Sequence, residues 1–255
     1  MYNTVFRAIG GFISKRAAAI ITDSEYSRKD IMRIFKINGK KINVIPVGVS
    51  EKYCPIKDQS VIEEVKNRYG IEQKYILYVG NFKPHKNVHT LIKAYNRLPN
   101  EIKDDYQLVL GGKKDRFYIE IGQLIGKLKI KQNVVFTDFI SEEHLPVLYS
   151  GAEMFVFPSL YEGFGLPILE AMACGIPVIS SDSSSLPEVV GDAGILVDAK
   201  SVKGLSRAIS TVLQDDKLRD ELRQKGLNRV KEFPMSNTSK KILNLLEQVV
   251  ISRYS

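Results

Sequence analysis

Apolar and polar residues alternate along the chain in two different rhythms. Short, nearly continuous apolar runs are separated by longer segments in which apolar residues recur every three to four positions. The short runs have the length and composition of buried strands, and the longer segments those of amphipathic helices. The predicted strands are Ala18–Thr22, Asn43–Val47, Tyr75–Val79, Gln107–Leu110, Val134–Thr137, Met154–Phe157, Val178–Ser180 and Gly194–Val197.

Helical periodicity is clearest in Asn87–Leu98, where apolar residues occupy positions i, i+3, i+4 and i+7. The same period predicts four further helices, at Phe117–Leu128, Glu142–Tyr149, Val202–Leu213 and Thr238–Val250. Strands that alternate with helices are typical of a parallel sheet covered by helices on its faces. The predicted fold class is therefore α/β, with a doubly wound parallel sheet.

Six of the predicted strands fall between residues 73 and 234, which is enough for one complete doubly wound domain. We assign this domain to residues 58–235. Residues 1–57 supply only two strands and form a partial α/β segment that ends in a linker at Ser50–Ser60. Residues 236–255 are predicted to form a terminal helix that packs back on the N-terminal segment.

Composition narrows the class of protein. The chain has 255 residues, of which 44% are hydrophobic, so it can bury a sizeable core and is not disordered. Cys54 and Cys174 lie far apart without a Cys-x-x-Cys pattern, which fits a reducing cytoplasm and argues against a disulfide framework. No run of 18 apolar residues occurs, and Arg7, Lys15 and Arg16 interrupt any signal-peptide core. We expect a cytoplasmic protein.

Positive charge is concentrated at the start of the chain. The formal net charge is +8, and residues 1–57 hold 11 Lys/Arg against 4 Asp/Glu. Such a segment attracts phosphates, including those of anionic lipids. Two interpretations stay open: peripheral contact with the inner face of a membrane, or a solvated face of a few helices. Basic residues do not alternate with aromatic ones, so we expect no nucleic-acid partner.

Chemically distinctive residues follow five of the predicted strands. The loops contain Gly80–Asn87, Gly111–Lys114, Asp138–Ser141, Pro158–Pro167 and Ser181–Ser185. Ligands of open parallel sheets bind beyond the carboxyl ends of the strands, where these loops meet. Glycine, lysine and serine in several such loops predict a phosphate-bearing ligand.

The loop after Met154–Phe157 is the most informative. Gly163 and Gly165 allow close backbone approach, and the N–H groups of a helix beginning near Leu166 would point at an anion. Glu162 and Glu170 would repel a diphosphate, so we expect them to accept hydrogen bonds from ribose or sugar hydroxyls. The alternative is that Glu170 only favours the helix N-terminus and Glu162 is a solvated loop residue.

The stretch EGFGLPILEAMACGIP at 162–177 resembles the Glu-x7-Glu signature of retaining nucleotide-sugar glycosyltransferases of group 1, or family 4, which have the GT-B fold. The resemblance extends to YVGNFKPHKN at 78–87, LPEVVGDAGILV at 186–197, TDSEYSRKDI at 22–31 and VIPVGV at 44–49. It covers nearly the whole chain. It implies a Rossmann-like C-terminal donor domain preceded by a truncated acceptor-side domain.

The resemblance also implies roles for individual residues. Lys86 would bind the donor diphosphate and Glu162 the transferred sugar, as the catalytic pair. Glu170 would bind the ribose, and the base would lie against Phe139 and Ile140. The remaining donor-binding residues are Gly80, Asn81, Lys83, Phe164, Gly165 and Leu166.

One position departs from the family pattern. Many relatives have an arginine after the glycine that corresponds to Gly80, whereas this chain has Asn81. Lys83 lies in the same turn and is a candidate to supply the missing charge. The GNFKPHKN version of the turn resembles the mannosyltransferase-like branch, which favours GDP-mannose.

These observations lead us to expect hexose transfer from a nucleoside diphosphate sugar to a saccharide or lipid-linked acceptor, with retention. No Asp-x-Asp motif and no histidine spacing suited to a metal occurs, so we expect neither a metal nor another cofactor. Alternatives are a non-catalytic nucleotide-sugar-binding subunit, or a sugar-nucleotide epimerase. An acceptor domain normally takes about 100–150 residues. We therefore expect the chain to transfer poorly without a partner chain, and apolar residues Phe6, Ile9, Phe12, Ile13 and 245–249 to be exposed or paired in an oligomer.

Overall fold

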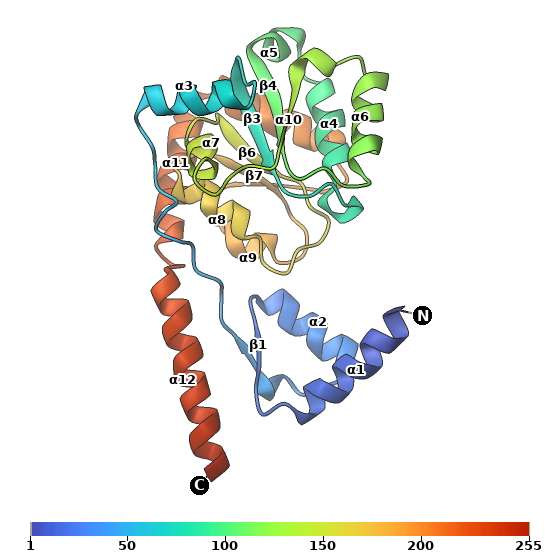
Figure 1. Cartoon of the computed structure of the whole chain (residues 1–255), viewed down its shortest axis with the longest axis vertical. Coiled ribbons are helices and arrows are strands. Elements are labelled where there is room, and N and C mark those ends of the chain that lie inside the picture. Colours follow the sequence, from blue (N-terminus) through green and yellow to red (C-terminus); the bar gives the residue numbers. More distant parts are fainter. Residues whose placement is uncertain (1, 255) are drawn as a thin grey trace. The chain divides into compact units, whose positions relative to one another are not determined.

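The chain forms two compact units (Figure 1). The computed structural model describes the backbone of residues 2–254 and the side chains of residues 7–251. Unit 1 is Met1–Gly48 together with Phe233–Ser255, and unit 2 is Val49–Glu232.

Unit 2 is built on a six-stranded, all-parallel sheet with the strand order β5-β4-β3-β6-β7-β8. The central strands β3 and β6 contain continuous runs of fully buried side chains rather than alternating ones, as expected for strands covered on both faces. All six predicted strands of this region are confirmed, and no observed end differs from the predicted one by more than one residue. Their bounds are β3 Lys74–Val79, β4 Tyr106–Gly111, β5 Val134–Asp138, β6 Met154–Phe157, β7 Val178–Ser181 and β8 Ile195–Val197.

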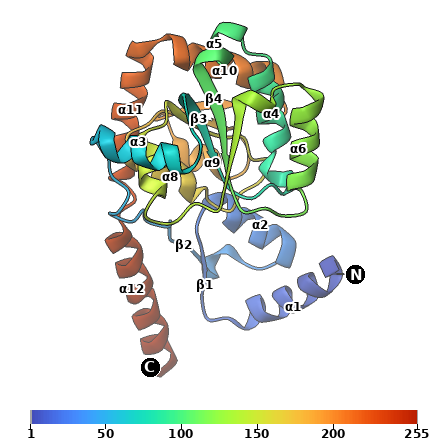
Figure 2. The same ribbon diagram turned by 45° about the horizontal axis from the view of Figure 1, so that its top comes forward.

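Helices cover both faces of the sheet (Figure 2). In one layer α4 packs against α6 and α10, and in the other α8 packs against α7, α9 and α11. This two-sided arrangement is the doubly wound, Rossmann-like architecture that the sequence predicts. The helices are α3 Gln59–Arg68, α4 Val88–Asn96, α5 Asn100–Asp105, α6 Tyr118–Lys127, α7 Leu145–Ser150, α8 Leu166–Ala173, α9 Leu186–Val190, α10 Val202–Gln214 and α11 Asp216–Val230, with short 3-10 turns at η2 Pro84–Lys86 and η3 Lys131–Asn133.

Unit 1 contains a two-stranded parallel sheet in which β1 pairs with β2, together with α1, α2 and α12. The terminal helix α12 is tied to the segment after β2, because Thr238 Oγ1 donates a hydrogen bond to the Pro46 carbonyl at 2.8 Å. Gly48 lies so close to the backbone of Met235 that a Cβ at this position would collide with it. The bounds are α1 Tyr2–Arg16, β1 Ile20–Thr22, α2 Glu25–Phe35, η1 Gly39–Lys41, β2 Ile42–Val44 and α12 Met235–Tyr254.

The boundaries of the units differ from those that the sequence suggests. Unit 2 begins at Val49 rather than at residue 58, because Tyr53 packs its ring against Tyr149, with 6.1 Å between ring centroids. The predicted linker Ser50–Ser60 thus includes residues that belong to unit 2 and the start of α3. The second boundary falls after Glu232 instead of residue 235.

Part of the apolar surface expected in unit 1 is observed. Ile9, Phe12 and Ile13 on α1 are more than half exposed, as is Leu246 on α12. The side chain of Phe6 lies outside the described residues. Within the described residues, no helix has the length and apolarity needed to cross a membrane.

Candidate functional site

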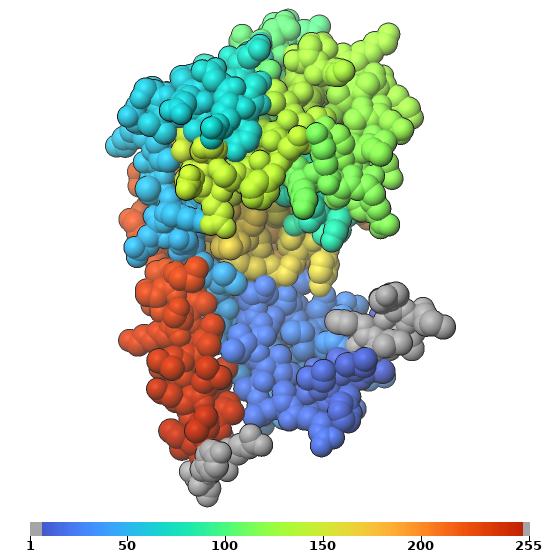
Figure 3. Space-filling view, viewed as in Figure 1, coloured from blue at the N-terminus to red at the C-terminus, as the bar shows by residue number. Residues whose placement is uncertain are grey.

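The strand order creates one point where ligands of this fold class bind. Strands β3 and β6 are neighbours in the sheet although β4 and β5 separate them in sequence. From β3 the chain continues outward to β4 and β5 on one side, and from β6 it continues outward to β7 and β8 on the other. The crevice beyond the carboxyl ends of such a pair is the usual ligand site of an open α/β sheet. Here it is flanked by loop 80–87 after β3 and loop 158–165 after β6. Figure 3 shows both loops reaching the surface of unit 2.

Loop 80–87 is shaped by its own polar groups. The Tyr78 hydroxyl donates to the Asn81 carbonyl at 2.6 Å, and Asn81 Oδ1 accepts from the Lys83 N–H at 3.2 Å. Asn81 therefore organises the turn, while the side chain of Lys83 is exposed. Gly112 in the neighbouring β4 loop must be glycine, because a Cβ there would overlap the Gly80 carbonyl oxygen.

Asn87 fastens loop 80–87 to its surroundings. The residue has a left-handed backbone conformation, with φ of 58°, and is buried. Its Nδ2 donates to the carbonyls of Pro158, at 2.9 Å, and Ala199, at 2.7 Å. Leu160 N–H also donates to the His85 carbonyl at 2.7 Å. Both loops are therefore held in a fixed relation.

Serines of the β7 loop hold the second loop from the other side. The Glu162 N–H donates to Ser184 Oγ at 2.9 Å, and Ser185 Oγ donates to the carbonyls of Glu162 and Phe164 at 3.0 and 2.9 Å. Ser185 is buried, and leaving its hydroxyl unpaired there would lower the stability of the folded state, so these hydrogen bonds stabilise the loop. The serines that the sequence shows after β7 thus support the loop of Glu162.

Helix α8 begins beside this loop. Its N-cap is Gly165, whose φ of 112° is open mainly to glycine, and Pro167 lies in its first turn. A Cβ at Gly165 would be 2.7 Å from Leu186 Cδ2, so the Leu186 side chain would also have to shift. The first N–H groups of a helix lack acceptors within the helix and favour an anion. Helix α8 presents such an end from Leu166.

The two loops are joined by a salt bridge between the residues expected to form the catalytic pair. Lys86 Nζ donates to Glu162 Oε1 at 2.6 Å, and each side chain is only 14% exposed. Lys86 Nζ also lies 5.3 Å from the centre of the Phe157 ring, a cation–π contact. The structure therefore brings together two residues that are 76 positions apart in sequence.

Glu170, on α8, is bonded to two tyrosines. Its Oε2 accepts from the Tyr149 hydroxyl at 3.2 Å, and its carboxyl also has a side-chain hydrogen bond with Tyr53. Burial raises the pKa of Glu170 above its ordinary value of 4.5, while the two phenol hydrogen bonds act in the opposite direction. Glu170 is therefore not a residue that merely stabilises a helix end in solvent.

A cavity of about 190 Å³ lies beyond the carboxyl ends of β3, β4 and β5. Phe139, which is 69% exposed, and Ile140 form one wall. The cavity lining is mainly apolar and glycine-rich, as suits the face of a planar ring. The lining residues are Val79, Gly80, Gly111, Gly112, Lys113, Phe139, Ile140 and Leu145.

The residues selected from sequence thus fall into four groups. Lys86, Glu162 and the segment 164–166 lie at the joined loops, whereas Gly80, Phe139 and Ile140 line the cavity. Glu170 is partly buried against tyrosines, and Asn81 and Lys83 shape the outer turn. Sequence reasoning missed Asn87, Tyr53 and Tyr149. Tyr149 is the last residue of a predicted amphipathic helix. Its position on the apolar face of that helix is typical of an ordinary core residue, so it was not selected.

Clusters of metal-ligating side chains were sought among the described residues. Among the described residues, no group of three or more His, Cys, Asp or Glu side chains is arranged to hold a metal ion.

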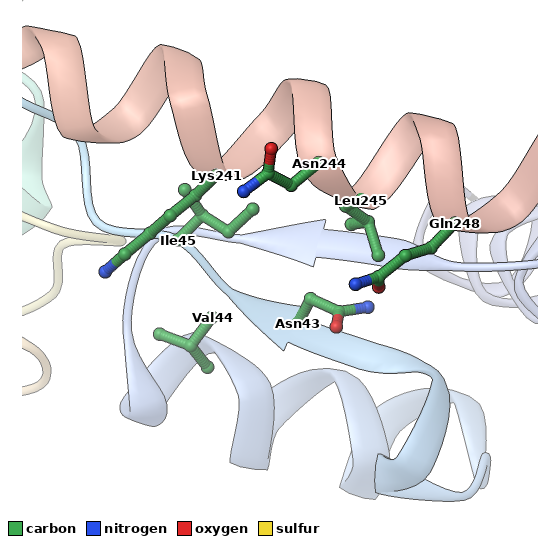
Figure 4. A pocket seen from close by; sticks show the side chains of 7 residues that line it. All are labelled: Asn43, Val44, Ile45, Lys241, Asn244, Leu245 and Gln248. Carbon is green, nitrogen blue, oxygen red and sulfur yellow. The ribbon is translucent and has the colours of Figure 1, made fainter.

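Unit 1 has a separate hollow of about 240 Å³ between β2 and α12, into which amide side chains face (Figure 4). Its lining is Asn43, Val44, Ile45, Lys241, Asn244, Leu245 and Gln248, none of which belongs to the predicted donor site.

Comparison with known proteins identifies the family. Residues 61–229 match the family described as glycosyl transferases group 1. The chain is 37% identical to O-antigen chain mannosyltransferase B of Escherichia coli over 228 residues. The aligned region covers 89% of this chain and 60% of that protein. The chain therefore belongs to the group 1 glycosyltransferases, and it spans about 60% of the length of this curated relative.

Solved structures agree on the fold. Sucrose-phosphate synthase of Thermosynechococcus elongatus superposes with a TM-score of 0.83 at 27% identity, over 98% of this chain and 62% of that one. Anabaena HepE, solved in complex with UDP and glucose, gives a TM-score of 0.87 at 21% identity, over 97% of this chain and 67% of that one. These neighbours confirm the predicted GT-B-type, Rossmann-like α/β fold.

Proposed function

We propose that the chain binds a nucleoside diphosphate sugar in the crevice between loops 80–87 and 158–165. We further propose that it transfers the hexose, with retention, to a saccharide or lipid-linked acceptor. The observation that carries this proposal is the Lys86–Glu162 pair at the junction of β3 and β6. A cation for phosphate and an acceptor for hydroxyls meet there, beside a helix N-terminus that favours an anion.

The parts of the donor can be assigned to neighbouring groups. The diphosphate would lie against Lys86 and the start of α8 at Gly165–Leu166, with Lys83 as an outer cation. Glu162 would accept a hydroxyl of the transferred hexose, and Glu170 those of the ribose. The base would occupy the cavity beside Phe139 and Ile140.

The chemistry demands stabilisation of a leaving group. When the bond between the sugar C1 and the diphosphate oxygen breaks, negative charge grows on the diphosphate. Lys86 and the α8 N-terminus are preorganised charges that would lower the energy of that state. The acceptor hydroxyl would attack C1 from the same face and pass its proton to the departing phosphate oxygen. This route needs no covalent enzyme nucleophile.

The sugar is proposed to be mannose, donated by GDP-mannose. The support is the GNFKPHKN turn and the likeness to a protein named as an O-antigen chain mannosyltransferase. An O-antigen-like polysaccharide built on a lipid carrier would be a fitting acceptor. The excess of basic residues in 1–57 supports contact with an anionic membrane surface on the cytoplasmic side. An oligomer or a partner chain is proposed to cover the exposed apolar residues of α1.

The test has two stages with the 255-residue chain. A thermal-shift screen compares GDP-, UDP- and ADP-sugars, because a ligand that binds the folded state raises the melting temperature. Labelled donor is then supplied with a panel of saccharide and lipid-linked acceptors, and the anomeric configuration of the product is determined. Binding with retaining transfer supports the full proposal. Binding without transfer, even with a partner chain added, favours a nucleotide-sugar-binding subunit. Failure to bind any nucleotide sugar would overturn the proposal.

A further inference from the structure

Two phenols meet one partly buried carboxylate, that of Glu170 on α8. Tyr149 is fully buried on α7, and its hydroxyl donates to Glu170 Oε2 at 3.2 Å. Tyr53, from the segment before α3, forms a second side-chain hydrogen bond with the same carboxyl. The three side chains come from three separate segments of unit 2.

The hydroxyl groups have a function distinct from that of the rings. The Tyr149 ring packs edge-to-face on Tyr53 and on Phe155, with centroids 6.1 and 5.4 Å apart. Phenylalanine would fill the same space and make the same ring contacts. A buried hydroxyl adds a desolvation cost that only its hydrogen bond offsets. The Tyr149 hydroxyl donates its hydrogen bond to Glu170, so this polar atom acts on the Glu170 carboxylate.

The Tyr53 segment is itself held in place. Lys52 Nζ lies 5.3 Å from the Tyr53 ring centre and forms a salt bridge with Glu142 at 2.9 Å. The Ile56 N–H donates to Ser150 Oγ, at the end of α7, at 3.0 Å. Tyr53 therefore reaches Glu170 from a backbone that is fastened on both sides.

We propose that Tyr53 and Tyr149 are positioning residues of the donor site, which hold the Glu170 carboxylate so that it accepts the ribose hydroxyls. The inference rests on the proposed function of Glu170. A carboxylate has two oxygens with about four acceptor positions. Two phenols fix its orientation and leave acceptor positions for a vicinal diol. A segment that precedes the predicted donor domain thus determines selectivity for ribose.

The test measures dissociation constants of GDP and 2′-deoxy-GDP by calorimetry on the full 255-residue chain. Variants are Tyr53→Phe, Tyr149→Phe and Glu170→Gln. The matched control is Tyr95→Phe, which removes a buried hydroxyl that donates to the Tyr106 carbonyl at 2.6 Å instead of to Glu170. Losing one orienting hydrogen bond should lower the preference for the ribonucleotide about two- to tenfold. Binding of 2′-deoxy-GDP should be unchanged, and Tyr95→Phe should keep the wild-type preference.

The outcomes distinguish the positioning role of the tyrosines from the proposed ribose-binding role of Glu170. If Glu170→Gln lowers the ribose preference but both tyrosine variants keep it, the tyrosines serve only folding and the inference is overturned. If Glu170→Gln also keeps the preference, the ribose assignment of Glu170 fails as well. Tyr53→Phe, on a segment outside the sheet, preserves the test should Tyr149→Phe not fold.

Discussion

Lys86 and Glu162 form a 2.6 Å salt bridge that connects the loop after β3 to the loop after β6. Both side chains are largely shielded from solvent, so removing one of them leaves the charge of the other shielded and uncompensated. In the proposed complex the diphosphate would compete with Glu162 for Lys86. Ligand binding would then release Glu162 to accept a hydrogen bond from the sugar.

This competition predicts an unusual behaviour for Glu162→Gln. Without the carboxylate, Lys86 lacks its anionic partner, and we expect the free energy of unfolding to fall by about 1–3 kcal/mol. A nucleoside diphosphate would replace the lost charge, so its affinity should equal or exceed that of the wild type. Transfer of the sugar should fall sharply. Chemical denaturation, calorimetry with GDP and a transfer assay measure the three effects.

A matched control is Glu221→Gln, which breaks an exposed i,i+4 salt bridge with Lys225 on α11. Its effect on stability should stay within about 1 kcal/mol, and diphosphate affinity should not change. A Glu162→Gln variant that binds GDP much more weakly than the wild type would contradict the competition between the carboxylate and the phosphate.

The start of α8 makes a second prediction. Gly165→Ala should destabilise unit 2 by about 1–3 kcal/mol, because φ is 112° and the new Cβ would press on Leu186. Diphosphate binding should weaken with it. In Gly122→Ala the new Cβ meets open space within α6, and stability should rise by up to about 1 kcal/mol. Equal effects of the two substitutions in urea unfolding would argue against strain at the α8 N-cap.

The burial of Glu170 predicts a pH dependence. Its pKa in the folded chain is raised above 4.5, so the folded state holds the proton more tightly than the unfolded state does. Ionisation therefore opposes folding. This cost is absent at low pH and grows as the pH rises from 4.5 through the raised pKa. Glutamine cannot ionise, so the Tm of Glu170→Gln relative to wild type should increase across that window. Calorimetric scans that show a constant or falling difference would contradict this sign.

Much of the fold of unit 2 was predictable because its central strands are buried on both faces. Runs such as Met154–Phe157 are apolar at every position, and their bounds follow directly from sequence. Helix α11, Asp216–Val230, was not predicted, because it is rich in charged residues and buries few side chains. Helix α7 begins at Leu145 rather than at Glu142, since Pro146 favours the first turn of a helix.

The candidate site was predictable as a set of residues but not as a set of contacts. The sequence indicates Lys86, Glu162 and Glu170 through the loops that contain them. Pairing of Lys86 with Glu162 depends on β3 lying next to β6, a neighbourhood that strand patterns alone do not define. The bond of Tyr53 to Glu170 depends on how the segment before α3 folds back on α7, which no local pattern encodes.

The central claim is that Lys86 binds the diphosphate of a nucleotide sugar. It is tested most directly by measuring the affinities of guanosine and GDP for the wild type, Lys86→Ala and the control Lys93→Ala, an exposed residue on α4. A charge-assisted hydrogen bond to phosphate contributes about 1.5–3 kcal/mol, or roughly tenfold to a hundredfold in affinity. We predict that Lys86→Ala loses this factor for GDP and keeps the wild-type affinity for guanosine, while Lys93→Ala changes neither. Equal losses for guanosine and GDP in Lys86→Ala, or no loss for GDP, would contradict the claim.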